Sequence, residues 1–156
     1  MVETNSLIVG VAVGLIAGAG GAAYLLACTW GFRKTFTFSD EEEEIVQPKD
    51  VCLLFMSKKK TSLLGRVTFV NNLDEKVVTV KFDKGGPFPQ DVGNPNNPSR
   101  GVYLVNPGDT IETLDIDKDP GWRFPGFPKK WKFDAYVPKQ NGGQKKLDPG
   151  VKVKRG

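Results

Sequence analysis

The sequence predicts an all-β sandwich of about seven short strands, preceded by one transmembrane α-helix. Three observations predict this architecture. Residues 7–27 are apolar and carry no charge, whereas every lysine and arginine lies at or after Arg33. Beyond that run, short apolar stretches alternate with turn residues, and the chain is rich in glycine (18) and proline (11). This composition suits a loop-rich β domain with one modest core better than it suits helices.

The apolar run is long enough to span a bilayer. The hydrocarbon core needs about 20 residues of helix, and LIVGVAVGLIAGAGGAAYLLA supplies that length. A secretory signal peptide fits less well, because the preceding MVETNS has an acid and no base and the run exceeds the usual apolar region. Leu25, Leu26 and Ala27 loosely resemble a lipobox, so lipidation of Cys28 is the alternative to a retained anchor.

Small residues recur every four positions along this run, at Gly10, Gly14, Gly18 and Ala22. Residues four apart share one helix face, and small residues let a second transmembrane helix approach closely. The alternative is that glycine is simply common in transmembrane helices. We expect a packing face, and therefore integral-membrane protein subunits as partners besides the lipid bilayer.

The stretch after the helix is acidic. Asp40 to Glu44 are five consecutive acids, which repel one another and predict a solvated spacer. An acidic contact for a basic partner surface is the other interpretation. We therefore divide the chain into an N-terminal tail and transmembrane helix (1–32), an acidic linker (33–50) and a β domain (51–156).

Alternating apolar residues bounded by turn signals predict the strands of the β domain. Val78, Val80 and Phe82 should share one face, and Trp131, Phe133, Ala135 and Val137 another. The stretches 65–72 and 76–83 flank a short turn and are expected to form a hairpin. The predicted strands are 51–57, 65–72, 76–83, 101–106, 110–116, 131–137 and 151–155.

Three stretches of this pattern are VTFVNNLDEKVVTVKF, YLVNPGDTIETLDI and WKFDAYVPKQNGGQKKLDPGVKVKR. Their V-x-F-x-N opening, central P-G-D turn and final aromatic strand resemble the cupredoxin family over residues 51–155. The resemblance implies a two-sheet Greek-key sandwich. It also implies a copper site that this chain does not keep, because Ala135 falls where copper-binding members have their cysteine. A blue-copper centre needs two imidazoles and a thiolate, and the chain has no histidine.

The sequence contains no motif for other catalytic chemistry, so we expect no enzyme activity and no cofactor. The lack of histidine removes Ser-His-Asp and Cys-His catalysis, and no phosphate-binding glycine loop precedes a helix. Asp115, Asp117 and Asp119 alternate as in a calcium loop, but Pro120 stands where an EF-hand needs glycine. A net charge of +4 is too mild to predict nucleic acid binding. Cys28 and Cys52 read as lone thiols.

Two regions are candidates for partner contact. Trp122, Phe124 and Phe127 lie in a loop between prolines and basic residues, either as caps of the sandwich or as a docking surface. Lys58, Lys59 and Lys60 form the first of four basic clusters, which would favour an acidic surface if they shared one side. The other three clusters are Lys129–Lys130, Lys145–Lys146 and Lys152–Arg155. The long connection 84–100 is expected to have little to pack.

These features predict a non-catalytic accessory or scaffold subunit of a larger integral-membrane complex, such as a respiratory or photosynthetic one. The alternative is a membrane-tethered binding module for a soluble ligand or an electron-carrier protein. No small-molecule substrate is evident. The expected location is the cell (inner) membrane. Arg33 and Lys34 after the helix favour a cytoplasmic β domain, whereas the resemblance implies the periplasmic or extracytoplasmic side, which we expect.

Overall fold

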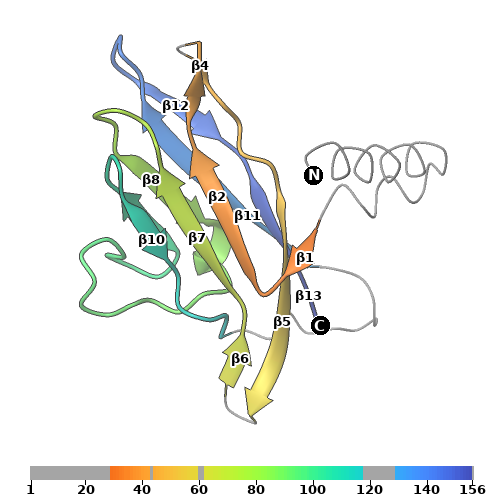
Figure 1. Ribbon diagram of the computed structural model, residues 1–156. Coiled ribbons are helices and arrows are strands. Elements are labelled where there is room, and N and C mark those ends of the chain that lie inside the picture. The colour runs from red at the N-terminus through yellow and green to blue at the C-terminus, as the bar shows by residue number, and fades with distance from the viewer. Residues whose placement is uncertain (1–28, 43, 60–61, 118–128, 156) are drawn as a thin grey trace, which may run out of the picture.

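In the computed structural model the chain forms an all-β domain with mixed sheets (Figure 1). The structure describes residues 29–42, 44–59, 62–117 and 129–155. Within these ranges no helix has the length and apolar character needed to cross a bilayer. The apolar run 7–27 lies outside them.

All seven predicted strands are present, and their ends shift by at most two residues except for 110–116, whose strand ends at Glu112. They are β5 (Val51–Lys59), β7 (Arg66–Asn71), β8 (Val78–Phe82), β9 (Val102–Val105), β10 (Thr110–Glu112), β11 (Lys129–Pro138) and β13 (Gly150–Arg155). The further elements are β1 (Trp30–Gly31), β2 (Arg33–Phe38), β3 (Asp40–Glu41), β4 (Glu44–Ile45), β6 (Ser62–Leu64), β12 (Gln144–Leu147) and the 3₁₀ turn η1 (Asp83–Gly85). The alternation that predicted the strands also sets their buried faces, as expected for β8 and β11.

The larger sheet has eight strands and mixes parallel and antiparallel pairs. Its order is β1-β5-β13-β11-β8-β9, with β12 also pairing with β11 and β6 with β5. β5 runs parallel to both β1 and β13, whereas the pairs β13–β11, β11–β8 and β8–β9 are antiparallel. The first and last strands of the β domain are therefore neighbours.

A smaller sheet of order β10-β7-β2 packs on the larger one through aromatic side chains. β7 lies between an antiparallel β10 and a parallel β2. The Phe36 ring of β2 meets the Phe133 ring of β11 edge-on, with centroids 4.8 Å apart. Phe69 of β7 lies 5.7 Å from the same ring and 6.4 Å from Phe82 of β8. Such tilted and edge-to-face pairs are the geometries that aromatic quadrupoles favour.

The predicted hairpin of 65–72 with 76–83 is wrong. β7 belongs to the smaller sheet and β8 to the larger one, so the chain crosses between layers after Asn71. The side chain of Asn71, which is 0% exposed, holds this corner. Its amide donates to the carbonyls of Lys76 (2.7 Å) and Val105 (2.8 Å), and its oxygen accepts from the N–H of Leu73 (2.9 Å). These bonds replace the ladder that a hairpin would have formed.

The prediction of a solvated linker over 33–50 is wrong for its first third. β2 pairs with β7 from Arg33 to Phe38, and both Phe36 and Phe38 are fully buried in the core. The acids that follow do lie at the surface, in the small hairpin formed by β3 and β4. The alternation of RKTFTF carried the strand signal, and the acidic run beside it masked that signal.

We expect the Phe69→Ala substitution to lower the free energy of unfolding by about 3–5 kcal/mol, the usual range for truncating a buried phenylalanine. Phe69 is 0% exposed and contacts five other aromatic rings across both sheets. Urea denaturation of the full chain in neutral detergent, followed by near-ultraviolet circular dichroism, measures the change. Val92→Ala is the control because Val92 is 84% exposed, and it should change stability by less than about 0.5 kcal/mol. Equal stability of the two variants would contradict the aromatic core.

Candidate functional site

Most residues singled out in the sequence lie outside the part that the structure describes. The glycine stripe (Gly10, Gly14, Gly18 and Ala22), the loop aromatics (Trp122, Phe124 and Phe127) and Lys60 all fall there. Lys58 and Lys59 are the last two residues of β5. The structure therefore leaves both contact hypotheses as predictions, and the candidate site is built from other residues.

A basic depression opens beside the first four residues of strand β11. It has a volume of about 460 Å³ and is lined by Asp83, Lys84, Lys129, Lys130, Trp131 and Lys132. It exists because neighbouring strands end at different levels. Phe82, the last residue of β8, pairs with Phe133, so residues 129–132 of β11 extend beyond the end of β8.

The turn η1 fixes the other wall of this depression. Lys84 has a left-handed backbone (φ 52°), and Gly85 and Gly86 follow with φ of 76° and 65°. A Cβ on Gly86 would lie 2.7 Å from the Phe82 ring, so only glycine fits at this close approach. The turn therefore places Lys84 among the residues that line the depression.

Four ammonium groups and one carboxylate line the depression. The ammonium groups differ in how closely a carboxylate or a ring lies to them. Lys130 Nζ lies 2.7 Å from Asp50 Oδ2, whereas Lys132 Nζ lies 3.9 Å from Asp148 Oδ2 with both side chains more than half exposed. Lys129 Nζ lies 4.3 Å from the centroid of the Trp131 ring. Within the described ranges Lys84 makes no ion pair, so the depression keeps a net positive charge.

The indole of Trp131 carries an unsatisfied donor in this wall. Its Nε1 atom is buried and has no hydrogen-bond acceptor among the described residues. Such a donor is costly to leave unpaired inside a protein. The ring otherwise packs on the hydrophobic core from the end of the larger sheet.

The register of the larger sheet places this depression near β1. Lys130 pairs with Lys152, Lys152 with Cys52, and Cys52 with Trp30, so these four residues form one rung across β11, β13, β5 and β1. Lys154, two residues further along β13, sits 4.3 Å from the centroid of the Trp30 ring. The Lys129–Lys130 and Lys152–Arg155 clusters thus meet at one end of the sheet.

Cys52 in this rung is disulfide-bonded and 0% exposed, so the expectation of a lone thiol at this position is wrong. Cys28, the other cysteine of the sequence, lies outside the described residues. With only two cysteines in the sequence, their spacing gave no indication of a disulfide.

The opposite end of the domain is acidic. β3 and β4 form its tip beside β12 (Figure 1), and Lys145 Nζ donates to the Ile45 carbonyl there (2.9 Å). Glu41, Glu42 and Glu44 line a shallow depression of about 660 Å³ at this tip. The Lys145–Lys146 cluster therefore lies apart from the basic end, and the four clusters do not share one side.

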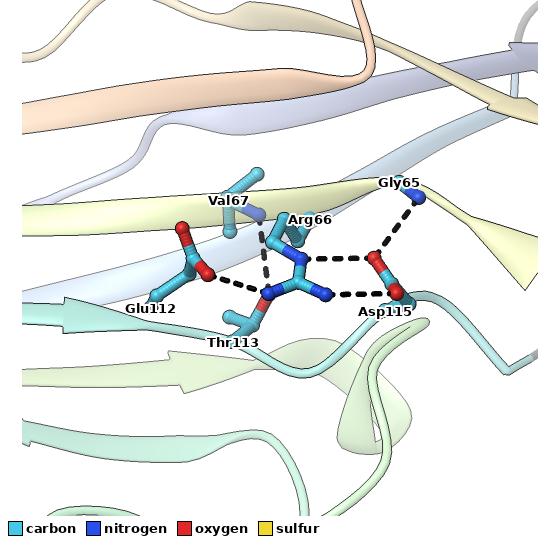
Figure 2. A network of polar contacts seen from close by, with 6 residues as sticks. All are labelled: Gly65, Arg66, Val67, Glu112, Thr113 and Asp115. Atoms are coloured by element: carbon cyan, nitrogen blue, oxygen red, sulfur yellow. Dashed lines mark hydrogen bonds and ion pairs between the residues drawn. The ribbon is translucent and has the colours of Figure 1, made fainter.

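A second charged cluster, the Arg66 network, closes the smaller sheet (Figure 2). Arg66 donates from Nε and Nη2 to the two oxygens of Asp115, both at 2.9 Å, and from Nη1 to Glu112 Oε1 at 2.6 Å. Gly65 N–H adds a bond to Asp115 Oδ1 (3.3 Å), and Val67 N–H bonds Thr113 Oγ1 (3.1 Å). These bonds fasten the segment after β10 to the start of β7.

This network raises the pKa of Arg66, mainly through the hydrogen bond to Asp115. It lowers the pKa of Asp115, mainly through the hydrogen bond from Arg66, while burial acts in the opposite direction. Asp117 has an arginine of its own, since Arg100 donates to both of its oxygens at 2.6 and 2.8 Å. Two of the three alternating aspartates thus serve as ion-pair partners, and Asp119 lies outside the described residues.

The described residues contain no group of three histidine, cysteine, aspartate or glutamate side chains placed to hold a metal ion. Ala135, the position that the cupredoxin resemblance gives to the copper thiolate, is buried between Val80 of β8 and Leu147 of β12. The arrangement offers electrostatic attraction for an anion at the basic end.

Together the fold and these surfaces define an all-β domain with mixed sheets. No family model, no curated protein and no solved structure matches the chain.

We expect Asp115→Asn to lower the free energy of unfolding at pH 7 by about 1.5–3 kcal/mol, the usual value of a hydrogen bond to a charged partner. Because the folded pKa of Asp115 lies below its unfolded value, its stabilisation is complete above about pH 5 and is lost as the pH falls below about 4. Urea titrations between pH 3 and 7 should show a shallower acid loss in this variant. Asp74→Asn, an exposed change, should follow the parent protein. An Asp115→Asn profile as steep as the parent's would contradict this role.

Proposed function

We propose that this chain is a single-pass, non-catalytic accessory subunit of a larger integral-membrane complex, for example a respiratory or photosynthetic one. The observation that carries the proposal is the uncharged run 7–27, which is followed within three residues by a strand of the sheet. Such a short connection would hold the β domain against the membrane surface. The glycine stripe would pack on a neighbouring helix, and the domain would clamp adjacent subunits.

The strand order supports a cupredoxin-like Greek-key sandwich as the more specific fold. In the larger sheet the order β9-β8-β11-β13-β5 places the last strand beside β5, the first strand of the predicted β domain, in parallel. In the smaller sheet β2 and β7 are also parallel, and the chain changes layers between β7 and β8. Crossings between two packed sheets also occur in Greek-key sandwiches, the fold that the sequence resemblance implies.

A scaffold role is supported by what fills the interior. Ala135, Val80 and Leu147 are each 0–1% exposed and occupy the region that the resemblance gives to copper. The sequence has no imidazole to take part in such a site. Its binding capacity then lies on the outside, at the basic and acidic ends.

The Cys52 disulfide supports an extracytoplasmic domain, since disulfides persist in oxidising compartments and are rare in the cytosol. Arg33 and Lys34 favoured the opposite, cytoplasmic location, because positive charges follow the predicted helix there. Both residues belong to β2, where they pair with Arg66 and Val67, so the fold accounts for their position. A pair of charges is also a weak determinant for a large translocated domain.

The basic depression favours a second candidate function, a membrane-tethered module that captures a soluble acidic ligand or electron-carrier protein. The two proposals differ in salt dependence. Capture by exposed lysines weakens steeply as salt rises, whereas helix packing inside a membrane responds little. Retention of partners in 0.5 M salt supports the subunit, and their complete loss supports the module.

Gly14→Leu should release the chain from its complex, because an isobutyl group at the centre of the stripe would block close helix approach. Affinity purification in mild detergent, with mass spectrometry of bound proteins, measures this. Leu15→Ile is the matched control on a neighbouring face and should keep the partners. Recovery of the parent chain as a lone monomer would contradict the subunit proposal.

Cys52 should resist alkylation in the full chain from native membranes until a reductant is added. The test is acid quenching, denaturation and reaction with a maleimide polymer, read as a mobility shift, with Cys52→Ser marking the band that belongs to this residue. Modification of Cys52 without reductant would contradict an oxidising location.

A further inference from the structure

We propose that the basic depression between η1 and β11 binds a phosphate group, and that the group belongs to an anionic lipid headgroup. The choice of a lipid rests on the proposed membrane anchor. The binding chemistry rests only on Lys84, Lys129, Trp131 and Lys132 and on the depression of about 460 Å³ that they line.

The first argument is charge. Lys130 is neutralised by Asp50 at 2.7 Å, so it contributes little to an incoming anion. Lys132 is held loosely by Asp148 at 3.9 Å, and Lys129 is held by the Trp131 ring rather than by a carboxylate. Lys84 has no carboxylate partner among the described residues. Three ammonium groups against the one carboxylate of Asp83 leave a site that favours a compact anion, and lysine binds phosphate as a point charge.

The second argument is an unused donor. Trp131 Nε1 is buried in the same wall and lacks an acceptor within the described part of the chain. A ligand rich in acceptor oxygens suits a wall that carries such a donor, whereas a cationic ligand would suit neither the donor nor the lysines. Phosphate matches the donors because its oxygens accept several hydrogen bonds at once.

The third argument is position. Lys130 and Trp30 lie on one rung three strand spacings apart, which is about 14 Å. Trp30 begins the sheet directly after the region of the apolar run, and tryptophan beside lysine suits the level of the headgroups. The acidic tip formed by β3 and β4 is at the far end of the domain (Figure 1), where it would avoid a negatively charged surface. The depression therefore lies at the end that would meet the headgroups.

Calorimetric titration of the full chain in neutral detergent tests the site. The probes are short-chain phosphatidylglycerol, short-chain phosphatidylcholine and inorganic phosphate. We expect phosphatidylglycerol to bind and phosphatidylcholine not to bind. The double variant Lys84→Ala/Lys132→Ala should weaken phosphatidylglycerol binding about tenfold or more, since each lysine near an anionic surface contributes roughly a factor of five.

The matched control is Lys76→Ala/Lys139→Ala, which removes two lysines beside the acidic end and should change the affinity less than twofold. Inorganic phosphate binding as tightly as the lipid, with the same dependence on Lys84 and Lys132, supports the phosphate site but assigns it to a free anion. The proposal is overturned if neither phosphatidylglycerol nor inorganic phosphate binds. It is also overturned if the two double variants lose the same affinity for phosphatidylglycerol.

Failure of the anchor is read separately. Flotation of the full chain with pure phosphatidylcholine vesicles depends on the apolar run and not on the lysines, because these vesicles carry no net charge. If the chain stays in solution in that assay but shows the lysine-dependent titration, the membrane anchor and the lipid assignment are contradicted. The phosphate site is then still supported.

Discussion

The contact between aromatic rings of two sheets is the interaction on which the rest of this structure depends. Phe69 of the smaller sheet meets Phe133 and Phe82 of the larger sheet, and Phe36 meets Phe133 edge-on. Burying these rings joins the layers and aligns their strands, and burial of large apolar side chains is the main favourable term in folding. These rings fill the space between the two sheets in the described part of the domain. Two charged depressions of the described part lie at the two ends of the domain.

Those ends differ because strands and turns stop at different levels. β11 extends beyond β8, which opens a basic depression beside Trp131 at the end that also holds Trp30. At the other end the β3–β4 hairpin gathers the acids of the segment 40–44. A domain with one basic and one acidic end has a preferred orientation near a charged surface. In the proposed membrane assembly, such a domain would supply orientation.

The strands could be predicted from the sequence because alternation of apolar residues follows directly from the period of a β-strand. The strand over 33–38 was missed since Phe36 and Phe38 stand beside an acidic run. The expectation that the connection 84–100 has little to pack was wrong. One of its side chains, the ring of Phe88, lies in the core and is 1% exposed. The depression could not be predicted, because it depends on the register of Phe82 against Phe133 and not on any local motif. Ion pairs such as Arg66 with Asp115 span 49 positions and leave no local pattern.

The central claim is that the aromatic contacts make the two sheets one cooperative unit. Hydrogen–deuterium exchange of the full chain in neutral detergent, read by mass spectrometry under native conditions, tests it most directly. The account predicts that amides of β7 and of β11 exchange with one common, slowest rate, and that the β3–β4 hairpin exchanges much faster. Exchange of β7 orders of magnitude faster than β11 would show that the sheets separate independently, and would contradict the account.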